Sequence, residues 1–75
     1  MSKDQDKLRT LKEEYGFKTV QTMLEYAMFD SIVPAICYNT NCSATCDMEP
    51  DQDQGWCEIC DTNTVKSCLI LAGLI

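Results

Sequence analysis

The chain has 75 residues, of which 45% are hydrophobic and 24% are charged, and its net charge is −6. This length allows one domain, and the composition is typical of a folded chain and excludes intrinsic disorder. A core of this size is marginal, so we expect a metal ion or disulfide bonds to stabilise the fold. The chain contains no histidine, which excludes catalysis through an imidazole group.

The first thirty residues carry two apolar stripes with helical spacing. The first stripe has i, i+3, i+7 spacing and consists of Leu8, Leu11 and Tyr15. Gly16 follows it, where a glycine commonly ends a helix. The second stripe has the i, i+3, i+4, i+7, i+8 spacing of an amphipathic helix and consists of Val20, Met23, Leu24, Ala27 and Met28. Thr19 is its expected N-cap. Residues 1–30 are therefore predicted to form a helical hairpin.

The next part of the chain has short apolar segments separated by turn-forming residues. Residues 32–36 predict a short strand, in which Pro34 favours a position at the edge of a sheet. Residues 45–48 predict a second strand, and the polar segment 49–55 is typical of a turn.

The segment 62–67 fits either a strand or a helix. Helical spacing links it to the apolar residues that follow, which are Val65, Cys68, Leu69 and Ala72. We therefore favour a helix or a turn and helix here, with Gly73 as its end.

Two close pairs of cysteines are the most informative feature of the sequence. They form the pattern Cys37-x4-Cys42-x14-Cys57-x2-Cys60. Two such pairs, separated by about a dozen residues, can converge on one tetrahedral metal ion. Zinc suits four thiolates because it accepts tetrahedral sulfur coordination and has no redox chemistry of its own.

This cysteine pattern resembles the zinc-ribbon group of small folds over residues 34–67. The second pair, within Trp56-Cys57-Glu58-Ile59-Cys60, matches the ribbon pattern, whereas the first pair has four intervening residues where two are usual. The resemblance implies a zinc-ribbon-like β module, and the N-terminal helices lie outside it. Together the two parts predict a small α+β metal-stapled domain, with the N-terminal helical hairpin packed on the β module. The hairpin (1–30) and the four-cysteine module (31–75) are expected to form one domain.

Six cysteines exceed the four ligands that zinc requires, so two must have other roles. Cys46 lies at ligand spacing from Cys42 and is an alternative ligand. We favour Cys37 with Cys42 because residues 39–41 are turn formers, as a metal-binding loop needs. Cys68 lies in an apolar segment and is expected to pack in the core. Disulfides and an iron centre on the same four ligands are the alternatives to zinc.

The charge distribution argues for a protein partner. Residues 31–75 contain Lys66 against six acidic residues, a balance of −5, whereas residues 1–30 have five basic and six acidic residues. Nucleic-acid binding depends largely on cations, so a nucleic-acid-associated zinc ribbon is a weaker alternative. We expect a basic or apolar protein surface as the partner, and the apolar segment at residues 69–75 makes a homo-oligomer a further possibility.

A four-cysteine site leaves no open coordination position, so we expect a structural metal and no enzyme activity. The main rival is a dithiol redox protein that uses Cys57 and Cys60, because Trp-Cys-x-x-Cys also occurs in thioredoxin-like proteins. That fold needs a βαβ unit, which the sequence does not predict. Trp56 is expected to cover the sulfurs or, alternatively, to anchor a partner.

The sequence favours a cytoplasmic location and no membrane association. The N-terminal residues contain charges and no apolar signal segment. The longest apolar run covers the eight residues 68–75, whereas about 20 are needed to cross a bilayer. In a reducing compartment, clustered cysteines are more often metal ligands than disulfides.

Overall fold

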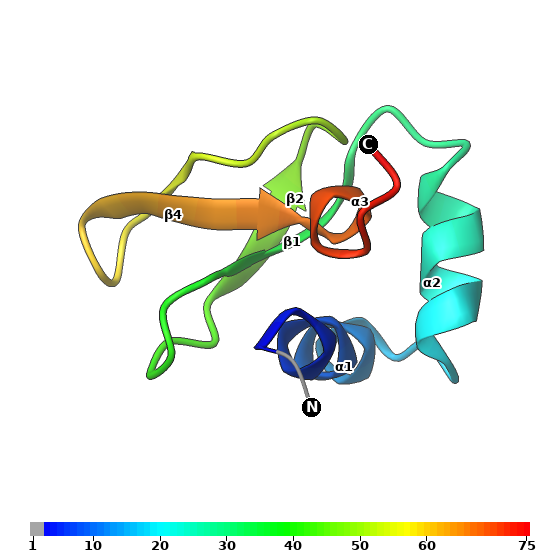
Figure 1. Cartoon of the computed structure of the whole chain (residues 1–75), viewed down its shortest axis with the longest axis horizontal. Helices are drawn as coiled ribbons and strands as arrows, with labels where there is room; N and C mark the ends of the chain where they lie inside the picture. Colours follow the sequence, from blue (N-terminus) through cyan, green and yellow to red (C-terminus); the bar gives the residue numbers. More distant parts are fainter. Residues whose placement is uncertain (1–2) are drawn as a thin grey trace.

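The computed structural model describes residues 3–75. Within them, N-terminal helices pack on a curled, four-stranded antiparallel sheet (Figure 1). This arrangement confirms the predicted α+β class. The elements in chain order are α1 (Lys3–Tyr15), α2 (Val20–Ala27), β1 (Val33–Cys37), β2 (Thr45–Met48), β3 (Gly55–Cys57), β4 (Thr62–Ser67) and α3 (Cys68–Leu71).

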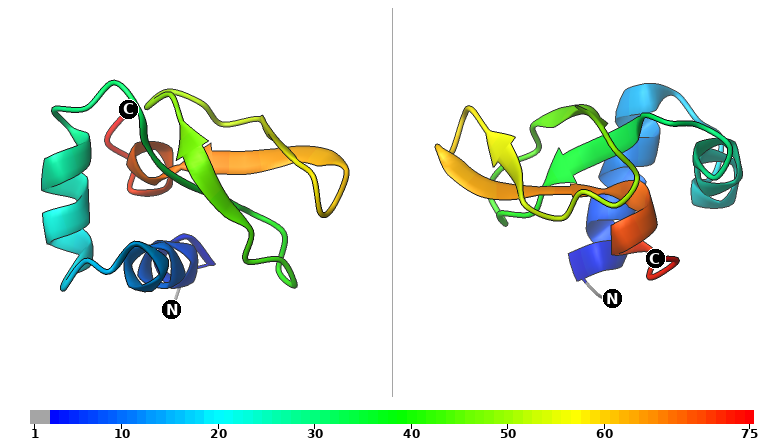
Figure 2. Two further views of the ribbon diagram at one scale, coloured as in Figure 1. Left: turned by 180° about the vertical axis from the view of Figure 1, so that it is seen from behind. Right: turned by 90° about the horizontal axis from the view of Figure 1, so that it is seen from above.

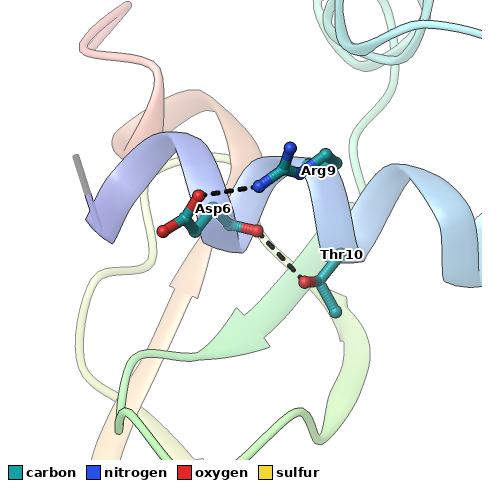
Figure 3. A network of polar contacts seen from close by, with 3 residues as sticks. All are labelled: Asp6, Arg9 and Thr10. Carbon is teal, nitrogen blue, oxygen red and sulfur yellow. Dashed lines mark hydrogen bonds and ion pairs between the residues drawn. The ribbon is translucent and has the colours of Figure 1, made fainter. Parts of the chain in front are cut away.

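Helix α1 is held to the sheet by its buried side. Leu8 and Leu11 are buried, as their spacing predicts. On its exposed side, the Arg9 guanidinium pairs with the Asp6 carboxylate at 2.9 Å, and the Thr10 hydroxyl donates to the Asp6 carbonyl at 3.1 Å (Figure 3). Both charged side chains are 53% exposed, so this pair adds little stability and the buried face fixes the helix.

The predicted helix boundaries in this region are confirmed. Gly16 follows α1 with a positive φ of 77°, a conformation that suits glycine because it has no Cβ. The Thr19 hydroxyl accepts a hydrogen bond from the Thr22 backbone N–H at 3.1 Å and caps α2. The short connection turns the chain sharply. In Figure 1, α1 is therefore seen end-on, whereas the axis of α2 lies in the plane of the picture.

The sheet has the strand order β2-β1-β4-β3. The late strand β4 therefore lies between β1 and β3 (Figure 2). The two edge strands approach each other where the sheet curls. A Cβ atom on Gly55 in β3 would lie 2.2 Å from the Met48 sulfur of β2. Glycine at this position thus allows the β2 and β3 edges to come together.

The prediction of an edge position for Pro34 is wrong, because β1 is an inner strand. The Cys37 N–H donates to the Ala44 carbonyl at 2.9 Å, on the β2 side of the strand. Successive N–H groups alternate in direction, so the nitrogen of Pro34 faces the β4 side. Pairing with β4 begins only at Ala35, so no residue of β4 lies opposite Pro34. The absence of an N–H on Pro34 therefore costs the sheet no hydrogen bond.

The helix favoured for residues 62–67 is also wrong, because this segment is strand β4. The helix that the spacing indicates begins later, at Cys68, where α3 starts with Ser67 as its N-cap. Gly73 follows α3 with a positive φ of 74°. Strand β3 was not predicted. Its three residues are too few to show an alternating pattern, and its pairing with β4 is irregular between Gly55 and Trp56.

The core consists of two clusters of buried side chains. The larger one lies between the helices and the sheet and includes residues of α1, α2, β1 and α3. The smaller one lies within the curled sheet and is rich in cysteine. No helix within residues 3–75 is long and apolar enough to cross a membrane.

Candidate metal centre

Four cysteine sulfurs meet at one end of the sheet. They belong to Cys37, Cys42, Cys57 and Cys60, and all lie within 4.8 Å of one another. The first three residues are buried and Cys60 is partly exposed. These are the four residues that the spacing selects, so the chain contains a four-cysteine cluster able to hold a metal ion such as zinc.

The distances between the sulfurs fit tetrahedral coordination. The Sγ atoms of Cys37 and Cys60 are 3.8 Å apart, as are those of Cys42 and Cys57. Four sulfurs placed about 2.3 Å from a central ion form a tetrahedron with edges of about 3.8 Å. A disulfide requires about 2.0 Å, and all six cysteines are free thiols in the structure. The donor set and its spacing therefore fit Zn²⁺.

Each pair of sulfurs is carried by a tight loop that leaves a strand. Cys37 ends β1, and the Cys42 N–H donates to the Asn39 carbonyl at 3.1 Å, which turns the first loop back. Cys57 ends β3, and the Asp61 N–H donates to the Cys57 carbonyl at 2.8 Å. Asp61 has a positive φ of 55°, a conformation that aspartate tolerates better than most residues. The strands β1 and β3 thus aim both loops at one point.

The surroundings shift the pKa values of two of the clustered thiols in opposite directions. Burial raises the pKa of Cys37. Hydrogen bonds from the Thr64 hydroxyl, the Asn39 backbone and neighbouring thiols outweigh this effect and lower the pKa to about 7. A backbone hydrogen bond from Ala44 lowers the pKa of Cys42, but burial and the neighbouring cysteines raise it to about 12. The raised pKa of Cys42 means that this thiol retains a proton that a divalent cation would displace.

Thr64 supports the cluster from the adjacent strand. Its Oγ1 lies 3.2 Å from the Cys37 sulfur and 2.9 Å from the Thr62 hydroxyl. When Cys37 is a thiolate it can only accept, so the Thr64 hydroxyl then donates to it. Outer hydrogen bonds of this kind orient a ligand and tune its basicity. Thr64 is thus a supporting residue of the site that the sequence did not reveal.

Helix α1 contacts the first metal-binding loop through a buried lysine. The Lys7 ammonium donates to the carbonyl oxygens of Asn39, at 2.6 Å, and of Cys42. Lys7 is only 7% exposed. A divalent ion with four thiolates carries a net charge of −2, so a cation held at this loop is electrostatically favourable. The helix therefore fixes the loop and places a positive charge beside it.

Tyr38 joins the same loop to the start of α1. Its hydroxyl donates to the Asp4 carboxylate, and this bond, followed by burial, raises its pKa. The ammonium groups of Lys3 and Lys66 lie 4.3 and 4.9 Å from the centre of its ring. Cation–π contacts of this kind are attractive, so the loop is bound from both the helix and β4.

The two other cysteines lie outside the cluster. Cys68 is fully buried among apolar side chains, as expected for a core residue. Burial raises its pKa to about 11. Cys46 is partly exposed in β2, and burial followed by the charge of Asp47 raises its pKa. Neither joins the group of four, and the alternative in which Cys46 replaces a ligand gains no support.

A groove of about 490 Å³ lies beside the cluster, between the two edge strands of the sheet. Cys46 and Met48 line it from β2, and Trp56 and Ile59 line it from β3 and the second loop. The side chains of Trp56 and Ile59 are 52% and 76% exposed. Trp56 therefore does not cover the sulfurs as a buried lid would.

The sequence reveals the ligands but not the groups around them. Nothing near Lys7 marks it as a residue that will be buried, because its partners are in a loop more than thirty positions later. No sequence motif around Thr64 indicates that its hydroxyl will lie beside the Cys37 sulfur. Comparison with known proteins adds no assignment, since no family model, curated protein or solved structure matches this chain.

Proposed function

We propose that this chain is a protein-interaction module stabilised by a structural Zn²⁺ that is bound by Cys37, Cys42, Cys57 and Cys60. The observation that carries the metal assignment is the spacing of the sulfurs, with two opposite pairs at 3.8 Å. Four thiolates would saturate a tetrahedral ion, so the metal would stabilise the fold and would not bind substrate.

The same geometry weighs against a dithiol redox function. Cys57 and Cys60 both belong to the group of four sulfurs. A metal bound there would engage both thiolates and leave neither free to attack a disulfide. A non-catalytic role, in a reducing compartment such as the cytoplasm, is therefore part of the proposal.

The surface next to the cluster supports the interaction role. Trp56 and Ile59 are large apolar side chains exposed along a groove whose lining also includes the carboxylates of Asp47 and Glu58. Exposed tryptophan is a frequent anchor in protein interfaces, and acidic neighbours favour a basic partner. The proposed partner is therefore a protein segment with both apolar and basic residues, and not a nucleic acid.

The metal assignment is tested by native mass spectrometry after reconstitution with Zn²⁺. We expect one zinc per chain, and we expect Cys57→Ser and Cys60→Ser to lose both the metal and cooperative unfolding. Cys46→Ser is the matched control, because it removes a nearby thiol outside the cluster and should keep one zinc. Zinc retention in the Cys57→Ser and Cys60→Ser variants, or its loss in the control, would contradict the ligand set.

The interaction role is tested by selecting a random peptide display library on the zinc-loaded protein. We expect enriched peptides with a net positive charge and an apolar anchor. A Trp56→Ala/Ile59→Ala double variant should bind them at least about tenfold more weakly. Phe29→Ala is the control, because Phe29 is 90% exposed and does not line the groove. No enrichment, or equal binding by the double variant, would overturn this role.

A further inference from the structure

A second hollow, of about 380 Å³, lies at the opposite end of β1 from the metal-binding cysteines. Three aromatic rings and two carboxylates contribute to its wall, together with Ile32. These residues are Tyr15, Phe17, Tyr26, Asp30 and Asp47. They come from the end of α1, the α1–α2 connection, α2, the loop before β1, and β2. None of the residues that line the hollow is a lysine or arginine.

Two of the three aromatic side chains are accessible from solvent, whereas Phe17 is partly buried and packs against the core. The side chain of Tyr26 is 64% exposed and that of Tyr15 is 37% exposed. Phe17 and Tyr26 have ring centres 5.9 Å apart and planes tilted by 54°. Because the two rings are tilted and not stacked face to face, they do not fully cover each other's faces. Ring faces are negative and attract cations.

The two carboxylates add negative charge that the chain itself does not balance. The Tyr15 hydroxyl donates to Asp47 Oδ1 at 2.7 Å, which fixes this carboxylate against the ring. Asp30 is exposed, and across residues 3–75 the one ion pair recorded joins Arg9 to Asp6. The hollow therefore combines two exposed tyrosine side chains with two acids that have no cationic partner in the described part of the chain.

Tyr38 is a tyrosine whose ring is contacted by cations of the chain itself. Its ring is contacted by the ammonium groups of Lys3 and Lys66. No such contact is recorded within residues 3–75 for Tyr15, Phe17 or Tyr26. A cation from another molecule could form with the rings of the hollow the same cation–π contact that Lys3 and Lys66 form with Tyr38.

We infer that this hollow binds the cationic side chain, lysine or arginine, of a segment of a partner protein. The exposed tyrosine rings would contact the alkyl stem and the charged group, and Asp30 and Asp47 would pair with the charge. The charge of −6 on the whole chain favours the approach of such a segment. The inference rests on the proposed interaction role only for the source of the cation, because the hollow and the groove are lined by different side chains apart from Asp47.

The test uses the full zinc-loaded chain and small probes, so it needs no protein partner. N-acetyl-arginine methylamide and N-acetyl-lysine methylamide are titrated while amide and aromatic NMR signals are followed. N-acetyl-norleucine methylamide is the uncharged control for lysine. We expect saturable shifts at Tyr15, Tyr26, Asp30 and Ile32 with the cationic probes, and none that saturate with the norleucine probe.

Matched variants separate the hollow from general electrostatic attraction. Tyr26→Ala should weaken binding of the cationic probes about fivefold, and Tyr26→Phe, which keeps the ring, should preserve it. Asp30→Asn should weaken binding about threefold, whereas Asp53→Asn, an equal change of charge at a residue that does not line the hollow, should have a smaller effect. Trp56→Ala should leave the probe affinity unchanged, because Trp56 lines the groove and not the hollow.

Two outcomes would overturn the inference. Equal shifts with the norleucine probe would show an apolar site without charge recognition. Shifts that spread over the acidic loop and survive in Tyr26→Ala would show diffuse attraction to a negative surface. Failure of peptide selection at the groove, together with saturable probe binding here, would overturn the groove as a docking site but not the hollow.

Discussion

Lys7 and Cys42 are 35 positions apart in sequence, yet the ammonium of Lys7 donates a hydrogen bond to the carbonyl oxygen of Cys42. The same ammonium binds the Asn39 carbonyl, so one side chain holds both the turn of the first loop and one of its ligands. This contact links helix α1 to the candidate metal centre. Docking of the helix and binding of the metal should therefore be coupled.

Replacing this lysine tests the coupling. Lys7→Met keeps the alkyl stem but leaves the Cys42 carbonyl without its ammonium donor and the Asn39 carbonyl with only the Cys42 N–H. We expect a loss of about 2 kcal/mol in the free energy of unfolding. Zinc affinity should fall about tenfold, because the loop loses its support and its nearby charge. Urea unfolding and chelator competition measure the two effects. Lys18→Met, which removes an exposed lysine, is the control, and an equal effect there would contradict the assigned role.

Thr64 provides a second test of support for the ligands. Thr64→Val keeps the shape of the side chain but removes the hydroxyl that lies 3.2 Å from the Cys37 sulfur. We expect zinc affinity to fall about tenfold while the stoichiometry stays at one. Competition with a chromophoric chelator measures this change. Thr62→Val, which removes a hydroxyl one step further away, should have a smaller effect, and the reverse order would refute the role of Thr64.

The buried thiol of Cys68 predicts a loss of stability at alkaline pH. Burial raises its pKa from 9.0 to about 11, so the folded state holds this proton more tightly than the unfolded state does. The contribution is complete below pH 9 and is lost as the pH rises from 9 towards 11. Urea unfolding across this range should show a smaller decrease for Cys68→Ala than for the unmodified chain. Parallel curves for the two proteins would contradict this prediction.

The backbone at Asp61 predicts a clear order among substitutions. Asp61 directly follows Cys60, at the end of the second loop, and has a φ of 55°. Asp61→Gly should fold with equal or slightly higher stability, whereas Asp61→Val should lose about 1–2 kcal/mol, because a β-branched residue is strained in this conformation. Thermal unfolding of the zinc-loaded proteins measures the difference. Equal stability of the two variants would show that the loop has another accessible conformation.

Local patterns in the sequence predict the elements whose signals are local. The helical stripe around Leu8 and Leu11, the cap at Thr19 and the paired cysteines all depend on residues within a few positions of one another. The cysteine pattern was informative because a structural zinc site in a chain without histidine takes four thiolates, which occur at restricted spacings. The structure places those four together, whereas their occupation by zinc remains a prediction.

Features that depend on distant pairing could not be read in this way. Segment 62–67 has both helical spacing and β-branched residues, and its pairing with both β1 and β3 decides between them. The inner position of Pro34 depends on where β4 ends, which no nearby residue signals. Tyr15 continues the helical stripe, yet it is 37% exposed because it lies at the hollow beside Asp47.

The position of β4 in the sheet has a consequence for the order of folding during synthesis. All four cysteines precede Thr62, so the ribosome makes every ligand before it makes the strand that joins β1 to β3. Until β4 emerges, no strand pairs with both β1 and β3, so nothing in the sheet holds the two loops together. We therefore expect the nascent chain to gain tight zinc binding in one late step, when insertion of the central strand aligns both halves of the site.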